Sequence, residues 1–492
     1  MNEALFRRYV PLLAWMVALS ALMLIPLKIM GTGYLPVDDA LRHAAKVVSG
    51  KPWSEIVVMR EGFPMDHNAG WHTVLGWVYG GMRCGTDGLV AFSVIFLFWL
   101  FAGLPLVWVR RPEAWLAAWL ICAVAHSGFI GRIFLGRPFI LTAAFLMILL
   151  FSWSRLKEGR ASPRQLGLAI LLIALSSWIH GSWYLWALPV LAFFLAGHWR
   201  SGGQLLGCWL AGAFLGATLT GHPWVYLWQA THHVITALGQ DVVQRTLVTE
   251  FQPTDGCFPM VLCVVVVLLW RKAAGQYHAS MVCNPVFLLG VLGWLLGLKV
   301  TRFWVDWGLP AFLVWMTLQI QDLLETHLDL SSAKRLLLSG GLAAGLFLVA
   351  TSDLHGRWTN CLATEYLTID NPSLAGWLPD SGGILYSADM GVYYQTFYKN
   401  PKAPWRYMLC SEPALMPPED YEIWKKIEWN YGSIRTYQPW VNKMRPADRL
   451  VIRGSSDGRP AIPELEWYYA VRGTWIGRLP HGANAASIPK QP

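Results

Sequence analysis

The sequence predicts a polytopic α-helical membrane protein of about 11 transmembrane helices with a small C-terminal α/β domain. Three observations support this fold class. Of its 492 residues, 55% are hydrophobic and only 14% are charged. Apolar runs recur from residue 9 to residue 352, and from Asp353 onward the composition becomes mixed. We therefore divide the chain into a membrane domain, 1–352, and a soluble domain, 353–492.

The first apolar segment, from Tyr9 to Ile29, is long enough to cross a bilayer. No small-residue cleavage site follows it, so we expect a retained anchor. A polar loop over 31–68 comes next, and the apolar piece 69–82 is too short to span and is expected at the interface or as a re-entrant segment. Further spans are predicted at 88–109, 113–131, 138–154, 166–179, 182–197, 204–220, 258–270, 285–299, 304–321 and 336–352.

Basic residues predict the orientation of these spans. With the N-terminus in the cytoplasm, the cytoplasmic turns contain Arg110-Arg111, the cluster at 155–164, and Arg271-Lys272, as the positive-inside rule requires. The loop 31–68 and the domain 353–492 then lie together on the extracytoplasmic side. The net charge of +9 is explained by these turns, so we expect the lipid bilayer and not nucleic acid as the partner.

The soluble domain shows alternating strand and helix signals. Strands are predicted at 383–387, at 405–409 and within 465–475, and helices at 391–398 and from Pro418 to about Asn430. The eight cysteines contain no CxxC pair, which argues against a metal cluster. If this domain is extracytoplasmic, Cys361 and Cys410 could form a disulfide.

Two adjacent carboxylates, Asp38 and Asp39, follow the first span directly. Acidic residues at such a position often cap a short helix, here one running to Val47-Val48. They also suit general base catalysis, in which a carboxylate removes the proton of an attacking hydroxyl. Because consecutive residues do not share a helix face, one Asp can point into a cavity while the other caps.

Basic and imidazole groups at the predicted outer ends of the spans complete the set of candidate site residues. Snorkelling to the interface explains one such group, but several on one side also suit binding of a lipid-linked phosphate. Substrate-binding candidates are Arg137, His180, His222, Lys299 and Arg302. Asp39, Asp66 and His67 are weak candidates for ligands of a divalent cation, Mg or Mn, although the histidines match no zinc spacing.

The whole arrangement resembles the GT-C class of membrane glycosyltransferases, which includes protein O-mannosyltransferases, oligosaccharyltransferases and aminoarabinose transferases. The acidic pair in the first outer loop, the many spans and the outer C-terminal domain carry this resemblance. The segment from Ile384 to Gly391 also resembles one in uncharacterised bacterial members. The chain lacks a WWDYG-like acceptor motif, and it has Asp38-Asp39 where protein O-mannosyltransferases have Asp-Glu.

The resemblance implies hexosyl or pentosyl transfer from a polyprenyl-phosphate-linked donor to a glycan, lipid or protein acceptor. Asp38 or Asp39 would be the catalytic or metal-binding carboxylate, and Arg302 or Arg137 would contact the donor phosphate. It also implies a bacterial inner membrane, with the C-terminal domain in the periplasm. The stereochemical outcome stays open.

Two other classes of function remain. A polymerase or ligase of the O-antigen type would use His and Arg in the long loop 221–257, such as His222, His232, His233 and Arg245. A transporter or flippase of lipid-linked glycans would carry out no chemistry. Transporters usually place ionisable groups near the bilayer midplane and often contain inverted repeats, neither of which is evident in this sequence.

Overall fold

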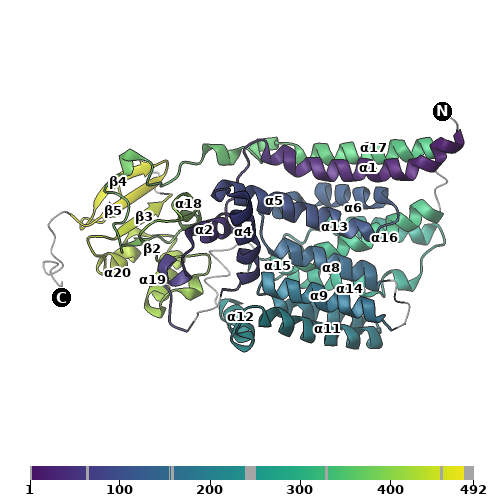
Figure 1. Cartoon of the computed structure of the whole chain (residues 1–492), viewed down its shortest axis with the longest axis horizontal. Helices are drawn as coiled ribbons and strands as arrows, with labels where there is room; N and C mark the ends of the chain where they lie inside the picture. The colour runs from purple at the N-terminus through teal and green to yellow at the C-terminus, as the bar shows by residue number, and fades with distance from the viewer. Residues whose placement is uncertain are drawn as a thin grey trace.

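The computed structural model describes residues 3–62, 66–154, 156, 160–238, 251–326, 331–454 and 458–480. It consists of a body of roughly aligned helices and, at one end of that body, a smaller unit built around a sheet (Figure 1). The N-terminus lies at the opposite end of the helical body from this unit (Figure 1).

Three described helical segments are long and apolar enough to cross a membrane, or up to five if two bent pairs are each counted as one span. The three belong to α1 (Glu3–Met30), to α5 (Thr86–Gly103) with the turn after it, and to α17 (Ser332–Thr351). Helices α1 and α17 lie side by side along one edge of the body (Figure 1). These helices support a membrane protein, whereas the total of eleven spans and their orientation stay predictions.

The other predicted spans all contain helices. These are α6 (Pro112–Ala125), α7 (Gly128–Phe134), α8 (Phe139–Trp153), α9 (Pro163–Ile179), α10 (Ala187–Leu195), α11 (Trp199–Thr218), α13 (Phe258–Ala273), α14 (Pro285–Gly297) and α16 (Leu309–Thr326). The predicted span 113–131 is broken, because α6 and α7 meet at an angle of 107°. A second break of 110° follows α11, where α12 (Pro223–Leu238) begins.

Three short helices fill the segment between α1 and α5: α2 (Asp39–Ser49), α3 (Trp53–Ile56) and α4 (Ala69–Met82). Helix α2 buries Ala40, Leu41, Ala44 and Ala45, the face that packs against α4, α5 and the soluble domain. An apolar stripe on an otherwise polar helix packs against a core and leaves the polar side chains on the other face. The apolar segment 69–82 forms α4, and its re-entrant or interfacial position stays a prediction.

The soluble unit contains a five-stranded sheet in the order β2-β1-β3-β5-β4. Strands β1 (Ile384–Tyr386), β2 (Arg406–Tyr407) and β3 (Arg449–Arg453) are parallel, and β5 (Thr474–Arg478) pairs antiparallel with β3 and with β4 (Glu466–Val471). Helices α18 (Met390–Lys399), α19 (Pro418–Trp429) and α20 (Gln438–Val441) complete it. All the predicted elements are confirmed; strand β3 was not predicted.

The first loop is attached to this sheet. Val57 forms a parallel bridge with Tyr407, and the backbone N–H of Val58 donates to the carbonyl of Tyr407 at 2.9 Å. The two cysteines considered as a disulfide do not pair. The Cys361 thiol lies against the backbone of Gly33 and Leu35, while Cys410 is buried near Glu412. The first loop and the C-terminal unit therefore meet at the same end of the molecule.

Candidate active site

A cavity of about 950 Å³ lies where the helical body meets the soluble unit. Its volume falls in the range of small-molecule sites in proteins. The helical body forms one wall of the cavity, with the start of α2, the turn before α8 and the segment before α16. The soluble unit forms the opposite wall, with α18, α19 and β3. Asp38, Asp39, Arg137, His180 and Arg302, which were predicted from separate parts of the sequence, all line it.

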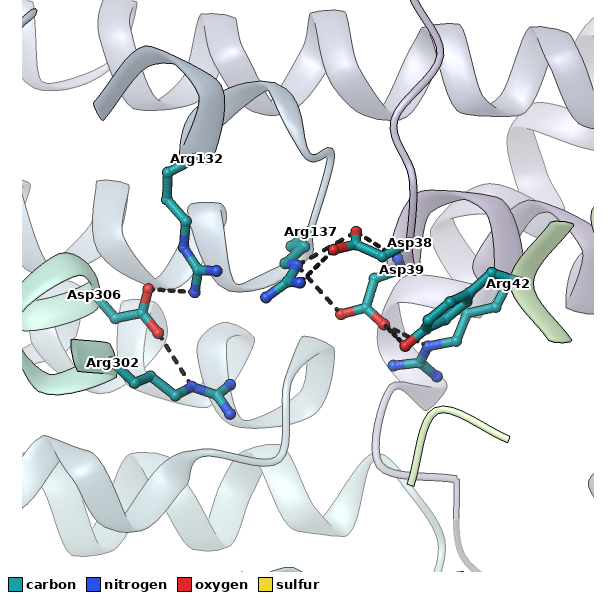
Figure 2. Close-up of polar contacts among 8 residues, drawn as sticks. Asp38, Asp39, Arg42, Arg132, Arg137, Arg302 and Asp306 are labelled. Carbon is teal, nitrogen blue, oxygen red and sulfur yellow. Dashed lines mark hydrogen bonds and ion pairs between the residues drawn. The ribbon is translucent and has the colours of Figure 1, made fainter. Parts of the chain in front are cut away.

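Asp38 is the N-cap of α2, and its Oδ1 accepts a hydrogen bond from the backbone N–H of Asp39 at 2.6 Å. The same carboxylate forms an ion pair with the Arg137 guanidinium, which lies between Asp38 and Asp39 in Figure 2. Arg137 is brought there by Gly136, whose φ of +66° turns the chain sharply. A Cβ on Gly136 would come within 3.1 Å of Ala40 and Val94, so glycine allows this close approach.

Asp39 is held between two arginines. Its Oδ1 accepts from Arg42 Nε at 2.7 Å, and its Oδ2 lies 3.6 Å from Arg137 Nε (Figure 2). Burial alone would raise the pKa of this carboxyl, but Arg42 and Arg137 outweigh burial and lower it well below its usual value. Asp39 is therefore ionised at neutral pH, and it faces the cavity as a fixed negative charge.

A second cluster, on the side of the cavity formed by the helical body, consists of one carboxylate and two arginines. Asp306, which is only 2% exposed, accepts from Arg132 Nη2 at 2.7 Å and from Arg302 Nε at 3.1 Å (Figure 2). It belongs to the π-helical turn Trp304–Gly308 that leads into α16. Local π-helical turns of this kind are frequent at functional sites.

Together, the two clusters contain more arginines than carboxylates, which makes the wall formed by the helical body positively charged. Four arginines, Arg42, Arg132, Arg137 and Arg302, are combined there with three carboxylates, those of Asp38, Asp39 and Asp306. Arginine presents its donors in a planar fork that matches phosphate geometry. Arg302 has the most exposed side chain of the four, at 30%, so it is the arginine most open to a bound anion.

The wall contributed by the soluble unit is more acidic. The Tyr394 hydroxyl lies 3.5 Å from Asp39 Oδ1, and Arg453 is bonded to Gln395 at 2.6 Å and to Asp389 at 3.4 Å. Burial, with the nearby charge of Asp389, raises the pKa of Glu428 to about 7. These groups offer both donors and acceptors, which suits a polar, hydroxyl-bearing molecule.

Of the three other substrate-binding residues predicted from the sequence, one lines the cavity and two do not. His180 lines it and bonds Ser182 Oγ at 2.8 Å; burial and Arg302 lower the pKa of this imidazole to about 3, so it is neutral. His222 and Lys299 are exposed and are not among the described residues that line the cavity. Arg245 lies outside the described residues.

The three residues suggested as cation ligands each have a protein side chain as a partner. Asp66 is bonded to His72, His67 lies 3.1 Å from Gln229, and Asp39 is occupied by arginines. Within the described parts of the chain, no group of three or more His, Cys, Asp or Glu side chains could hold a metal ion. A divalent cation at Asp39, Asp66 and His67 stays a prediction.

Two charged residues at the site were not predicted from the sequence: Arg42, which lines the cavity, and Asp306, which is bonded to the lining residues Arg132 and Arg302. Arg42 follows Asp39 by three residues, one turn of α2, and Asp306 follows Arg302 by four, so a search for charge pairs at helical spacing would have found both. A carboxylate inside an apolar segment, as Asp306 is, also signals function. The residues on the opposite wall gave no such signal, because only the tertiary fold brings α18 and α19 to the cavity.

Comparisons with known protein families and with curated proteins give no match. Among solved structures, the chain is similar to the oligosaccharyltransferase of Archaeoglobus fulgidus, which was crystallised tethered to an acceptor peptide. The TM-score is 0.44 at 11% identity, and the alignment covers 92% of this chain and 70% of that one.

Proposed function

We propose that this protein is a membrane glycosyltransferase that moves a sugar from a polyprenyl-phosphate-linked donor to an acceptor on the extracytoplasmic face. The observation that carries the proposal is the shared cavity, in which the carboxylate pair Asp38-Asp39 and an excess of arginine side chains lie side by side. Transfer from a lipid phosphate needs both features: a base for the acceptor and a cationic site for the leaving group.

The proposed reaction is a displacement at the anomeric carbon of the donor sugar. A hydroxyl of the acceptor forms the new C–O bond, and the bond between the sugar and the phosphate oxygen breaks. The phosphate keeps the electron pair, and Arg302 with Arg132 stabilises the charge that develops on it. Asp38 or Asp39 removes the hydroxyl proton. Pre-formed ion pairs hold these groups, so little reorganisation is needed during the reaction.

The soluble unit is proposed to bind the acceptor. Its wall of the cavity carries Asp389, Gln395, Glu428 and Arg453, which can hydrogen-bond to hydroxyl groups. The acceptor class stays open between a glycan, a lipid and a protein, and the proposed location is a bacterial inner membrane. The polymerase or ligase alternative depends on the loop 221–257, and its His222 lies away from the cavity lining.

Binding of a polyprenyl-phosphate sugar to the purified protein tests this function. We expect wild type and the double variant Asp38→Asn/Asp39→Asn to bind the donor, and Arg302→Ala to bind it about tenfold or more weakly, since a charge-assisted contact to phosphate contributes roughly 1.5–3 kcal/mol. Lys272→Ala, which removes an exposed lysine at the end of α13, is the matched control and should bind normally.

Two results would contradict the proposal. Absence of binding by wild type across several donor sugars would favour a transporter of another substrate. Equal binding by wild type and Arg302→Ala would remove this arginine from the proposed phosphate site.

A further inference from the structure

Beside the carboxylate pair, the cavity is bordered by a chain of hydrogen-bonded side chains that the proposed reaction does not yet use. His43 lies one turn after Asp39 on α2, is fully buried and lines the cavity. Its Nδ1 lies 2.8 Å from Nε2 of His72 on α4, and Nδ1 of His72 lies 2.5 Å from Oδ2 of Asp66. The order Asp66–His72–His43 is thus a linear chain of three titratable groups.

The chain of contacts fixes the tautomers of both imidazoles. Burial would raise the pKa of Asp66, but His72 and the backbone N–H of Asn68 outweigh burial and lower it, so this carboxylate is ionised and only accepts. In its neutral form, His72 then carries its proton on Nδ1 and accepts at Nε2. His43 in turn donates from Nδ1, which leaves a free lone pair on its Nε2.

The Nε2 atom of His43 is buried and has no hydrogen-bond partner among the described residues. A buried nitrogen without a partner is unfavourable unless a ligand or a reaction uses it. His43 also shares a helix face with Asp39, four residues earlier, and the two groups interact electrostatically. His43 therefore lies on the same face of α2 as the carboxylate that is proposed to meet the acceptor hydroxyl, and both residues line the cavity.

We propose that His43 takes up the proton released by the acceptor hydroxyl during transfer, with His72 and Asp66 as positioning residues that hold its acceptor tautomer. This inference rests on the proposed glycosyl transfer. As the acceptor oxygen bonds to the anomeric carbon and the phosphate departs with the electron pair, the proton that the carboxylate pair removes passes within the cavity to Nε2 of His43, which holds no hydrogen bond among the described residues. The resulting imidazolium is stabilised through His72 by the charge of Asp66, an arrangement like other acid–histidine pairs in catalysis.

The surroundings of His43 also allow the proton to leave again. Burial lowers its pKa well below the usual value, and Arg42 and His72 act in the same direction, while Asp39 and Asp66 act against it. An imidazole in this setting holds a proton only transiently at neutral pH. His43 can therefore return to its neutral form after each transfer, once the product leaves the cavity.

The test is steady-state transfer by His43→Gln, measured with a hydroxyl acceptor and, separately, with azide as the nucleophile. Azide is an anion and brings no proton, so its attack on the sugar needs no base. We expect kcat with the hydroxyl acceptor to fall by on the order of 10²-fold or more, with donor KM and azide transfer unchanged. Asp66→Asn should lower kcat in the same way by a smaller factor, and His278→Ala, at an exposed histidine, should not.

The outcomes separate this inference from the function it rests on. Normal kcat in His43→Gln would overturn it, as would a parallel loss of hydroxyl and azide transfer, which would mark His43 as structural. If wild type transfers sugar to neither nucleophile, the proposed glycosyltransferase function itself fails. Donor binding by each variant serves as the check on folding.

Discussion

The charge state of each carboxylate in the cavity depends on its immediate partners. Asp39 is kept ionised by Arg42 and Arg137, whereas burial and the charge of Asp389 raise the pKa of Glu428 on the opposite wall. The sequence shows the types of these residues but not their pairs. Asp38, Asp39, Arg137 and Arg302 could be selected because they lie at predicted span ends. The burial and the arginine contacts that act on the pKa of Asp39 arise only in the folded chain.

Glu428 gives a prediction about stability. Its pKa is about 7 in the folded protein because of burial and Asp389, and close to the ordinary carboxyl value in the unfolded chain. The protonated form therefore stabilises the fold at acid pH, and this contribution is lost as the pH rises through 7. We expect Glu428→Gln, which mimics the protonated form, to raise the melting temperature at pH 8 by roughly a few degrees and to leave it unchanged at pH 4.

The control for this prediction is Glu422→Gln, which changes an exposed carboxylate on the same helix α19. Its melting temperature should differ little from wild type at either pH. Equal effects of Glu428→Gln at pH 8 and pH 4 would show that the stability change does not come from ionisation of Glu428.

At the scale of elements, α2 organises the site. Its N-cap is Asp38, and its second turn carries Arg42 and His43. The apolar face of α2 fixes these polar groups, because it packs between the helical body and α18. The sequence predicted a short helix after the acidic pair, and this is confirmed. Its contacts with α4 and α18 could not be predicted, since they join segments far apart in the chain.

Close packing of α9 against α11 supports the helical body and can be tested at one glycine. Gly212 and Gly216 form a GxxxG pattern on α11, and small residues at this spacing let membrane helices approach closely. A Cβ on Gly216 would lie 2.3 Å from the carbonyl oxygen of Ala174. We expect Gly216→Ala to destabilise the protein by about 1–3 kcal/mol, the usual cost of overpacking.

Gly207 on the same helix provides the matched control, because a Cβ there would meet nothing within 4 Å. Gly207→Ala should leave stability unchanged or increase it slightly, since alanine favours helix more than glycine. Thermal unfolding in detergent measures both variants. The packing argument fails if Gly216→Ala is as stable as Gly207→Ala.

For the whole molecule, the arrangement of the two units decides where chemistry can occur. The helical body and the soluble unit meet at the end away from the N-terminus (Figure 1), and the cavity lies at that junction. Hydrophobic runs and basic doublets predicted the helical body and the placement of the first loop with the C-terminal unit. Periodicity could not reveal the breaks at His126 and after α11, because bent helices and straight ones have the same apolar composition.

The central claim is that this cavity transfers a sugar from a lipid phosphate. The most direct measurement is the release of free polyprenyl phosphate from a polyprenyl-phosphate sugar by purified protein with an acceptor mixture. We predict release by wild type and a loss on the order of 10²-fold or more in Asp38→Asn/Asp39→Asn, with Asp370→Asn, an exposed aspartate, unaffected. Release at the wild-type rate by the double variant would contradict the account.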